Sequence, residues 1–221
     1  PLEHHAILHT AEALKKEGYD VQYVPVDQYG VVDMQALERQ ICDNTALVSV
    51  IAANNEIGTL APLKEIGALC HSRGALFHTD AVQAFGHVPI DVKDMGIDML
   101  SLSGHKLNGP KGVGAIYIRS GLTFEPSITG GGQERNRRSG TENVPGIVGL
   151  GEAARLRKEN LQEEMKRTGA LSRKLIDGVM STIPEVILTG HPTNRLPGTV
   201  SFAIAAVEGE SMILMLDHEG I

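Results

Sequence analysis

Residues 46–80 read ALVSVIAANNEIGTLAPLKEIGALCHSRGALFHTD, and this stretch predicts a strand, a helix and a second strand. Residues 46–51 form an apolar, β-branched run of the kind that is buried on both faces of a parallel sheet. Pro62 suits the start of the following helix and Gly74 suits its end. Residues 75–79 form the second buried run. A strand, a helix and a strand in this order indicate a βαβ unit with parallel strands.

Outside this unit, the same alternation of strand and helix patterns continues toward both ends of the chain. Apolar spacing predicts a helix over residues 6–14, which Gly18 ends, and Asp33 is suited to cap a second helix. Further strands are expected at residues 21–26, 97–102 and 113–119. The fold class is therefore α/β, with an open, mostly parallel sheet and helices on both faces.

The last third of the chain has a different character. A long polar helix is expected over residues 148–167 and another helix over 170–181, followed by short strands at 186–188 and 199–204. We place a domain boundary near residue 165. Residues 1–165 then form a larger domain, and residues 166–221 form the beginning of a smaller one.

Composition excludes several classes of protein. The 221 residues include 20 Lys and Arg against 27 Asp and Glu, for a net charge of −7, which argues against a nucleic-acid groove or a polybasic membrane anchor. Two cysteines, Cys42 and Cys70, cannot form a disulfide framework, so a reducing, cytoplasmic location is expected. Both are expected to be inert packing residues. No run of 18 apolar residues indicates a membrane span.

The chain has no initiator methionine, and it ends directly after the apolar run at residues 212–216. We therefore expect it to be a fragment of a longer protein. Small molecules and proteins are the expected partners.

Polar clusters follow three of the predicted strands at residues 54–58, 80–83 and 103–106. In open α/β sheets, ligands bind outside the carboxyl ends of the strands. Lys106 could act there as a nucleophilic amine, although most lysines are only solvated surface charges. Asp80 could simply cap a helix, or it could pair with a protonated pyridine nitrogen. A lysine for a Schiff base and an aspartate for the ring nitrogen are the groups that pyridoxal 5′-phosphate (PLP) chemistry most needs.

Five motifs, in order and over the whole chain, resemble those of the cysteine desulfurases, the NifS-like branch of the fold-type I PLP enzymes. The motifs are EHHA at 3–6, NNEIG at 54–58, HTDAVQ at 78–83, SGHKxxGPKG at 103–112 and GGGQExxxRSGTEN at 130–143. The resemblance implies that residues 1–165 are the PLP-binding large domain, and that residues 166–221 begin a small α+β domain.

The resemblance also implies a role for each motif residue. Lys106 would form the Schiff base with PLP, His4 would stack on the ring, and Asp80 would hold the pyridine nitrogen. The remaining cofactor residues would be Asn55 and Gln83 near the phenolic oxygen, Ser103 and His105 at the phosphate, and Thr141, which such dimers contribute to the phosphate site of the opposite subunit.

The activity implied by the resemblance is conversion of L-cysteine to L-alanine. Sulfur would leave as an enzyme persulfide for iron–sulfur cluster or thio-cofactor assembly, which requires a sulfur-acceptor or scaffold protein. In this family the catalytic cysteine and the arginine that binds the substrate carboxylate follow the segment resembling residues 216–221, and a phosphate-binding turn precedes the segment resembling residue 1. We therefore expect the 221-residue piece alone to be inactive.

Two alternatives remain open. The protein could be another class-V PLP enzyme, such as a selenocysteine lyase or an aminotransferase, or a non-catalytic scaffold of the same fold that binds a partner protein. His5 and His9 have the spacing of metal ligands on a helix, but no carboxylate motif accompanies them, so no metal site is expected.

Overall fold

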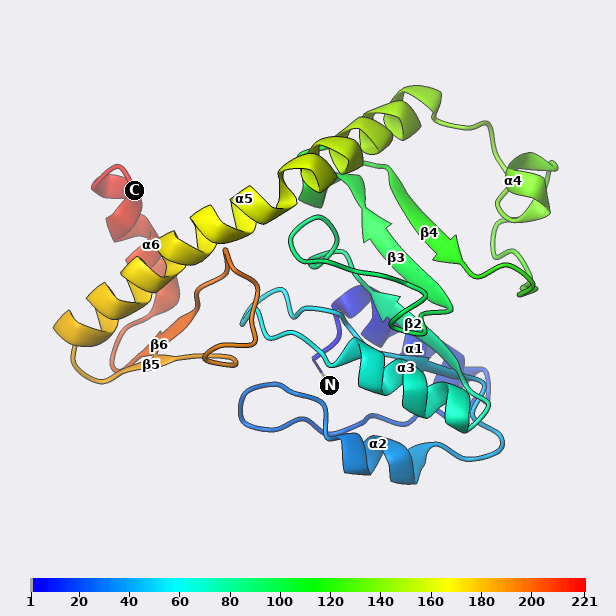
Figure 1. Ribbon diagram of the computed structural model, residues 1–221, viewed down its shortest axis with the longest axis horizontal. Helices are drawn as coiled ribbons and strands as arrows, with labels where there is room; N and C mark the ends of the chain where they lie inside the picture. The colour runs from blue at the N-terminus through cyan, green and yellow to red at the C-terminus, as the bar shows by residue number, and fades with distance from the viewer. Residues whose placement is uncertain (1) are drawn as a thin grey trace.

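A four-stranded sheet forms the centre of the computed structural model, which describes residues 2–221 (Figure 1). Its strands are β1 (Leu47–Ser49), β2 (Leu76–Asp80), β3 (Met99–Ser103) and β4 (Gly114–Ile118), in that spatial order. β1, β2 and β3 are parallel, and β4 pairs with β3 in the antiparallel direction. The prediction of a mostly parallel α/β sheet is therefore confirmed.

Three helices accompany the sheet: α1 (His5–Lys16), α2 (Met34–Gln40) and α3 (Leu63–Ser72). Figure 1 shows α3 in front of the sheet and α1 behind it. The predicted start of α2 is correct, because the Asp33 carboxylate accepts hydrogen bonds from the backbone N–H groups of its second and third residues, each at 2.9 Å. Gly74 follows α3 with φ +76°, a conformation that ends a helix at little cost only for glycine.

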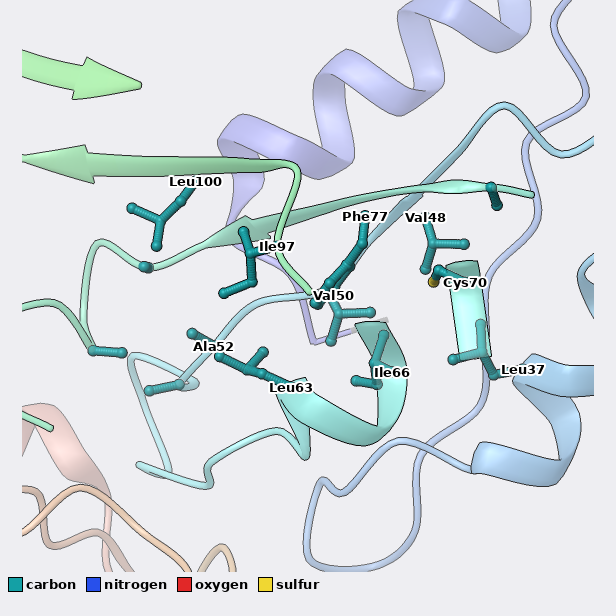
Figure 2. Packing of buried hydrophobic residues seen from close by; sticks show 14 of the residues in the cluster. Leu37, Val48, Val50, Ala52, Leu63, Ile66, Cys70, Phe77, Ile97 and Leu100 are labelled. Carbon is teal, nitrogen blue, oxygen red and sulfur yellow. The ribbon is translucent and has the colours of Figure 1, made fainter. Parts of the chain in front are cut away.

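The hydrophobic core lies between α2, α3 and one face of the sheet (Figure 2). Leu37 of α2, Ile66 and Cys70 of α3, and Phe77 of β2 are all 5% exposed or less. Because side chains alternate across a strand, burying Phe77 on this face turns its neighbour His78 to the opposite face.

Asp98 ties three elements together at the start of β3. Its side chain is fully buried and accepts hydrogen bonds from the backbone N–H of Phe77 at 2.8 Å, from Nε2 of His71 at 3.0 Å and from Nε of Arg119 at 2.5 Å. Burial by itself would raise the pKa of Asp98, but these three donors together hold it below its ordinary value of 3.8. The folded carboxylate thus binds a proton less readily than the unfolded one. Its stabilising contribution is present above pH 3.8 and is lost as the pH falls further.

Replacing Asp98 by alanine is expected to lower the free energy of unfolding by about 3–5 kcal/mol, because it leaves the buried N–H of Phe77, the His71 ring and the Arg119 guanidinium without their acceptor. Asp94→Ala is the matched control. It removes only an exposed ion pair with Lys64 and should cost about 1 kcal/mol or less. Urea unfolding of the protein that contains this chain measures the loss of free energy in both variants. Equal losses in the two variants would contradict the role of Asp98.

The predicted strand at residues 21–26 is wrong. Among the described residues, only Val26 of this segment forms a β-bridge, and it pairs locally with Val32 across a tight turn. Pro25 has no N–H to donate, and its carbonyl bonds to the N–H of Asp33 at 3.0 Å. The segment has the alternation of apolar and polar residues that is typical of a strand, but in the described part of the chain no strand lies beside it to pair with.

The two helices predicted at residues 148–167 and 170–181 are one continuous helix, α5 (Val144–Thr182), 39 residues long. At 1.5 Å per residue it spans roughly 58 Å. Gly169 lies in its interior, where glycine costs about 1 kcal/mol relative to alanine but does not break the helix. Packing against the loop after β5 holds this part, because Oγ of Ser172 donates to the carbonyl of Pro197 at 2.5 Å.

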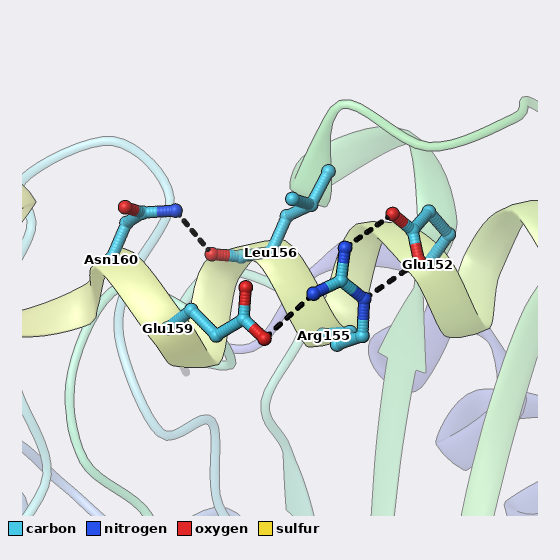
Figure 3. Close-up of polar contacts among 5 residues, drawn as sticks. All are labelled: Glu152, Arg155, Leu156, Glu159 and Asn160. Carbon is cyan, nitrogen blue, oxygen red and sulfur yellow. Dashed lines mark hydrogen bonds and ion pairs between the residues drawn. The ribbon is translucent and has the colours of Figure 1, made fainter.

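The surface of α5 carries helix-spaced ion pairs. Arg155 pairs with Glu152 and Glu159, each at 2.6 Å, while the side-chain amide of Asn160 donates to the carbonyl of Leu156 at 2.8 Å (Figure 3). All are exposed, so water screens each pair and its contribution to stability is small. No helix of residues 2–221 combines the length and apolarity that crossing a membrane requires.

A second, two-stranded sheet forms after α5. Strands β5 (Val186–Leu188) and β6 (Phe202–Ile204) are antiparallel, and α6 (Gly209–His218) follows them. Figure 1 shows α5 running from the main sheet to this second sheet. Residue 165 therefore lies inside a helix that extends from the four-stranded sheet to the two-stranded sheet. The domain boundary placed there stays a prediction.

Candidate functional site

The carboxyl ends of β1, β2 and β3 meet at one edge of the sheet because these strands are parallel. Asp80 is the last residue of β2 and pairs in register with Ser101 of β3. Ser103 is the last residue of β3, and Lys106 lies in the 3₁₀ turn η1 (Gly104–Leu107) that follows directly. The topology thus brings the predicted aspartate and the predicted lysine to the same edge.

Asp80 offers one carboxylate oxygen to a ligand. The side chain is 7% exposed, and its Oδ1 accepts a hydrogen bond from the backbone N–H of Val82 at 2.9 Å. Among residues 2–221, Oδ2 has no hydrogen-bond partner. A nearly buried negative charge with a free oxygen suits a cationic N–H donor.

The backbone around Lys106 is tightly built. A Cβ on Gly104 would lie 2.9 Å from the carbonyl of Pro110, so only glycine fits there. The N–H of Gly109 donates to the carbonyl of Gly104 at 3.0 Å, and Leu107 is buried against α5. These contacts fix the backbone that carries the half-buried Lys106 side chain.

Ser103 and His105 form a polar pair next to the lysine. Oγ of Ser103 and Nδ1 of His105 are 2.7 Å apart. A hydroxyl, an imidazole and the lysine amine together make a set of donors that suits an anion.

The loop after β1 uses its two asparagines differently. Asn54 is buried, and its Oδ1 accepts from the N–H groups of Glu56 and Ile57, each at 2.9 Å. Asn55, which the sequence singled out, is exposed. Asn54 shapes the turn and leaves Asn55 free to contact a ligand.

His4 lies at the start of α1 as its N-cap, where Nδ1 accepts from the N–H of Ala6 at 3.2 Å. The residue before it was not given a role in the sequence analysis. Glu3 accepts a hydrogen bond from the N–H of Ile51 at 2.5 Å, just beyond β1. Burial raises the pKa of Glu3 to about 7; the bond from Ile51 opposes this shift, and the negative charge of Asp80 adds to it.

His78 is a second site residue to which sequence reasoning gave no role. Its Nδ1 lies 2.8 Å from Oγ of Ser49 and its Nε2 lies 2.9 Å from Oγ of Ser101. Burial lowers the pKa of His78, which favours the neutral imidazole. The sequence did hold one signal for a role of His78, which is that a histidine stands within a run of residues that predicts a buried strand. Its two partners lie on other strands and could not be inferred from it.

Two predicted cofactor residues lie apart from this cluster. Gln83 follows the turn after Asp80 and lines an open cleft of about 670 Å³, together with Leu107 and residues of α5. Thr141 is exposed in the loop between α4 (Gln133–Asn136) and α5. None of the hydrogen bonds among residues 2–221 joins Thr141 to the lysine or to the Ser103–His105 pair.

The remaining candidates of the sequence analysis lie outside the edge. Cys42 is exposed, and a hydrogen bond with Thr45 lowers its pKa, whereas burial raises the pKa of Cys70 to about 11. The rings of His5 and His9 stack with centroids 5.2 Å apart. In the part of the chain that the structure describes, no three His, Cys, Asp or Glu side chains group in a way that could hold a metal ion.

Comparison with known proteins places this geometry in a family. The model of the aminotransferase class-V family matches residues 1–221. The chain is 54% identical over its whole length to cysteine desulfurase IscS of Clostridium botulinum and 52% identical to cysteine desulfurase IscS of Methanosarcina thermophila. It spans 56% and 54% of those two proteins, respectively.

Solved structures agree with these relatives. A NifS-like protein superposes on the whole chain with a TM-score of 0.95 at 41% identity, and the chain covers 60% of it. DndA from Streptomyces lividans superposes on 98% of the chain with a TM-score of 0.88 at 30% identity, and 62% of DndA is covered. The chain belongs to the class-V aminotransferase family and has the fold of its NifS-like members.

Proposed function

We propose that the protein containing this chain is a PLP-dependent cysteine desulfurase, which converts L-cysteine to L-alanine and passes the sulfur to an enzyme thiol. The observation that carries the proposal is the placement of Lys106 and Asp80 at the carboxyl edge of one parallel sheet. The curated relatives that match the whole chain bear the name cysteine desulfurase.

The residues at the edge fit PLP by their chemistry. A half-buried lysine supplies the amine for a Schiff base, and the unpartnered Oδ2 of Asp80 suits a protonated ring nitrogen. Ser103 and His105 supply donors for a phosphate. When bound, PLP supplies an electron-withdrawing ring that stabilises negative charge at the substrate Cα.

Each side chain then has a defined task. Lys106 would hold the cofactor, and its amine would move the proton at Cα of the substrate. Asp80 would favour a proton on the ring nitrogen by charge attraction. We propose that His4 would stack on the ring, and that Asn55 and Gln83 would bind on the side of the phenolic oxygen and the substrate.

The substrate and partners follow from the same proposal. A solved relative, SspA in complex with cysteine, is 34% identical and superposes with a TM-score of 0.80, which supports cysteine as the substrate. We propose that the sulfur serves iron–sulfur cluster or thio-cofactor assembly through an acceptor or scaffold protein in the cytoplasm. The relatives named IscS support that use.

The test uses the purified protein that contains this chain. Adding PLP should produce a visible absorbance band, and adding L-cysteine with a reductant should release equal amounts of alanine and sulfide. A band without alanine would point to another class-V reaction, such as transamination. The absence of a band would overturn the proposal in favour of a non-catalytic scaffold.

A homodimer is part of the proposal because Thr141 is exposed and no hydrogen bond among residues 2–221 joins it to Lys106 or to the Ser103–His105 pair. A cofactor site completed by the opposite subunit requires an isologous twofold contact. Sedimentation velocity of the PLP-loaded protein is expected to give the mass of two chains. A monomer that retains PLP would exclude this role for Thr141.

A further inference from the structure

Two hydrogen bonds fasten the segment before α1 to the end of β1. Oε1 of Glu3 accepts from the backbone N–H of Ile51 at 2.5 Å, and the side-chain amide of Asn54 donates to the carbonyl of Leu2 at 3.0 Å. The partners in the first bond are separated by 48 positions in the sequence, and those in the second bond by 52. They place Glu3, the residue before His4, within range of the charge of Asp80.

His4 depends on this attachment for its position. Its ring is exposed, and its one hydrogen bond among residues 2–221 is to Ala6 of its own helix. That bond fixes the ring relative to α1 but does not fix α1 relative to the sheet. The link nearest to His4 is the side chain of Glu3, and the bond between Asn54 and Leu2 adds to it.

The Glu3 carboxyl is suited to a neutral role. Among residues 2–221, its second oxygen, Oε2, is buried and has no hydrogen-bond partner, and a negative charge left there would be costly. Asp80 lies close enough for its charge to oppose a second one. Of two neighbouring carboxyls, one can thus stay ionised while the other holds its proton.

We propose that Glu3 is a positioning residue for the cofactor site: as a neutral carboxyl it binds the backbone of Ile51 and thereby holds His4 over the edge where Asp80 lies. This inference rests on the proposed PLP site. It assigns to Glu3 a task that acts through His4 and does not require Glu3 to touch the cofactor.

The substitutions separate the parts of this role. Glu3→Gln keeps the oxygen that accepts from Ile51 and is always neutral, so PLP affinity should stay within about twofold of the parent. Glu3→Leu loses the acceptor and should weaken PLP binding roughly fivefold to tenfold, the equivalent of one hydrogen bond. Glu65→Leu, which removes an exposed carboxylate from α3, is the matched control and should leave PLP affinity unchanged.

A double-mutant cycle with His4→Ala provides the decisive measurement. If Glu3 acts through His4, adding Glu3→Leu to His4→Ala should weaken PLP binding by less than about twofold further. Affinity is measured by the absorbance of bound PLP. Independently, amide hydrogen exchange at Ala6 and Ile7 in the cofactor-free protein should speed up in Glu3→Leu and not in Glu3→Gln.

Several outcomes would overturn the inference. Losses of affinity that simply add in the cycle, or a Glu3→Gln variant as weak as Glu3→Leu, would show that Glu3 does not position His4. If Glu3→Leu fails to fold, Glu3→Asp serves instead, because its shorter side chain cannot reach Ile51 and it should also bind PLP weakly. A parent protein that binds no PLP would refute the proposed function itself, which distinguishes the two failures.

Discussion

Replacing Lys106 by alanine is expected to abolish turnover of L-cysteine in the protein that contains this chain. The substitution removes the amine that would hold the cofactor and the base that would move the proton at Cα. The loss of kcat should therefore exceed the factor of about 10²–10⁴ that a single general base supplies. The backbone of η1 should survive, because Gly104, Pro110 and the buried Leu107 hold it without help from the lysine side chain.

Lys111→Ala is the matched control for this prediction. Lys111 lies five residues further along the same loop and is exposed, so its removal should leave kcat unchanged. Borohydride reduction of the PLP-loaded parent protein, followed by peptide mapping, should place the pyridoxyl group on Lys106. Recovery of the label on another lysine would refute the assignment.

Much of the central sheet could be predicted from the sequence because its evidence is local. The runs that became β1 and β2 contain β-branched or aromatic residues, and the run that became β3 consists mainly of Ile, Met and Leu. Helix signals such as Asp33 and Gly74 stand next to the helices they bound. Once three strands are parallel, their ends must share an edge. That step alone brings Asp80 and Lys106 into one region.

The rest depends on partners that are distant in the sequence. Residues 21–26 have the alternation of a strand, but strand formation needs a neighbour, and none lies beside them in the described part of the chain. Gly169 looks like the end of a helix, yet contacts near Pro197 support α5 through it. The burial of Glu3 follows from a bond to Ile51 and could not be inferred from either residue alone.

The Asp80→Asn variant is expected to lose cysteine turnover by about 10²-fold or more while still binding PLP. Asparagine keeps the oxygen that accepts from the N–H of Val82, so the turn after β2 should be preserved. The substitution removes the negative charge. An opposite charge within 4–6 Å typically shifts the pKa of a group by about 1–3 units, and here that group would be the ring nitrogen. Without it the ring nitrogen loses its proton near neutral pH, and negative charge at Cα loses its stabilisation.

The surroundings of Asp80 make this charge hard to replace. Burial lowers the pKa of His78, two residues earlier on β2, and raises that of Glu3 to about 7, so just below pH 7 the imidazole has lost its proton, the Glu3 carboxyl keeps its own, and both neighbours are mainly neutral. The charge of Asp80 is then not neutralised by either group and remains available to the ligand. Asp94→Asn, an exposed carboxylate, is the control and should keep full activity. Turnover in Asp80→Asn within a few-fold of the parent, measured at saturating PLP, would show that another group protonates the ring nitrogen and that Asp80 only organises its turn.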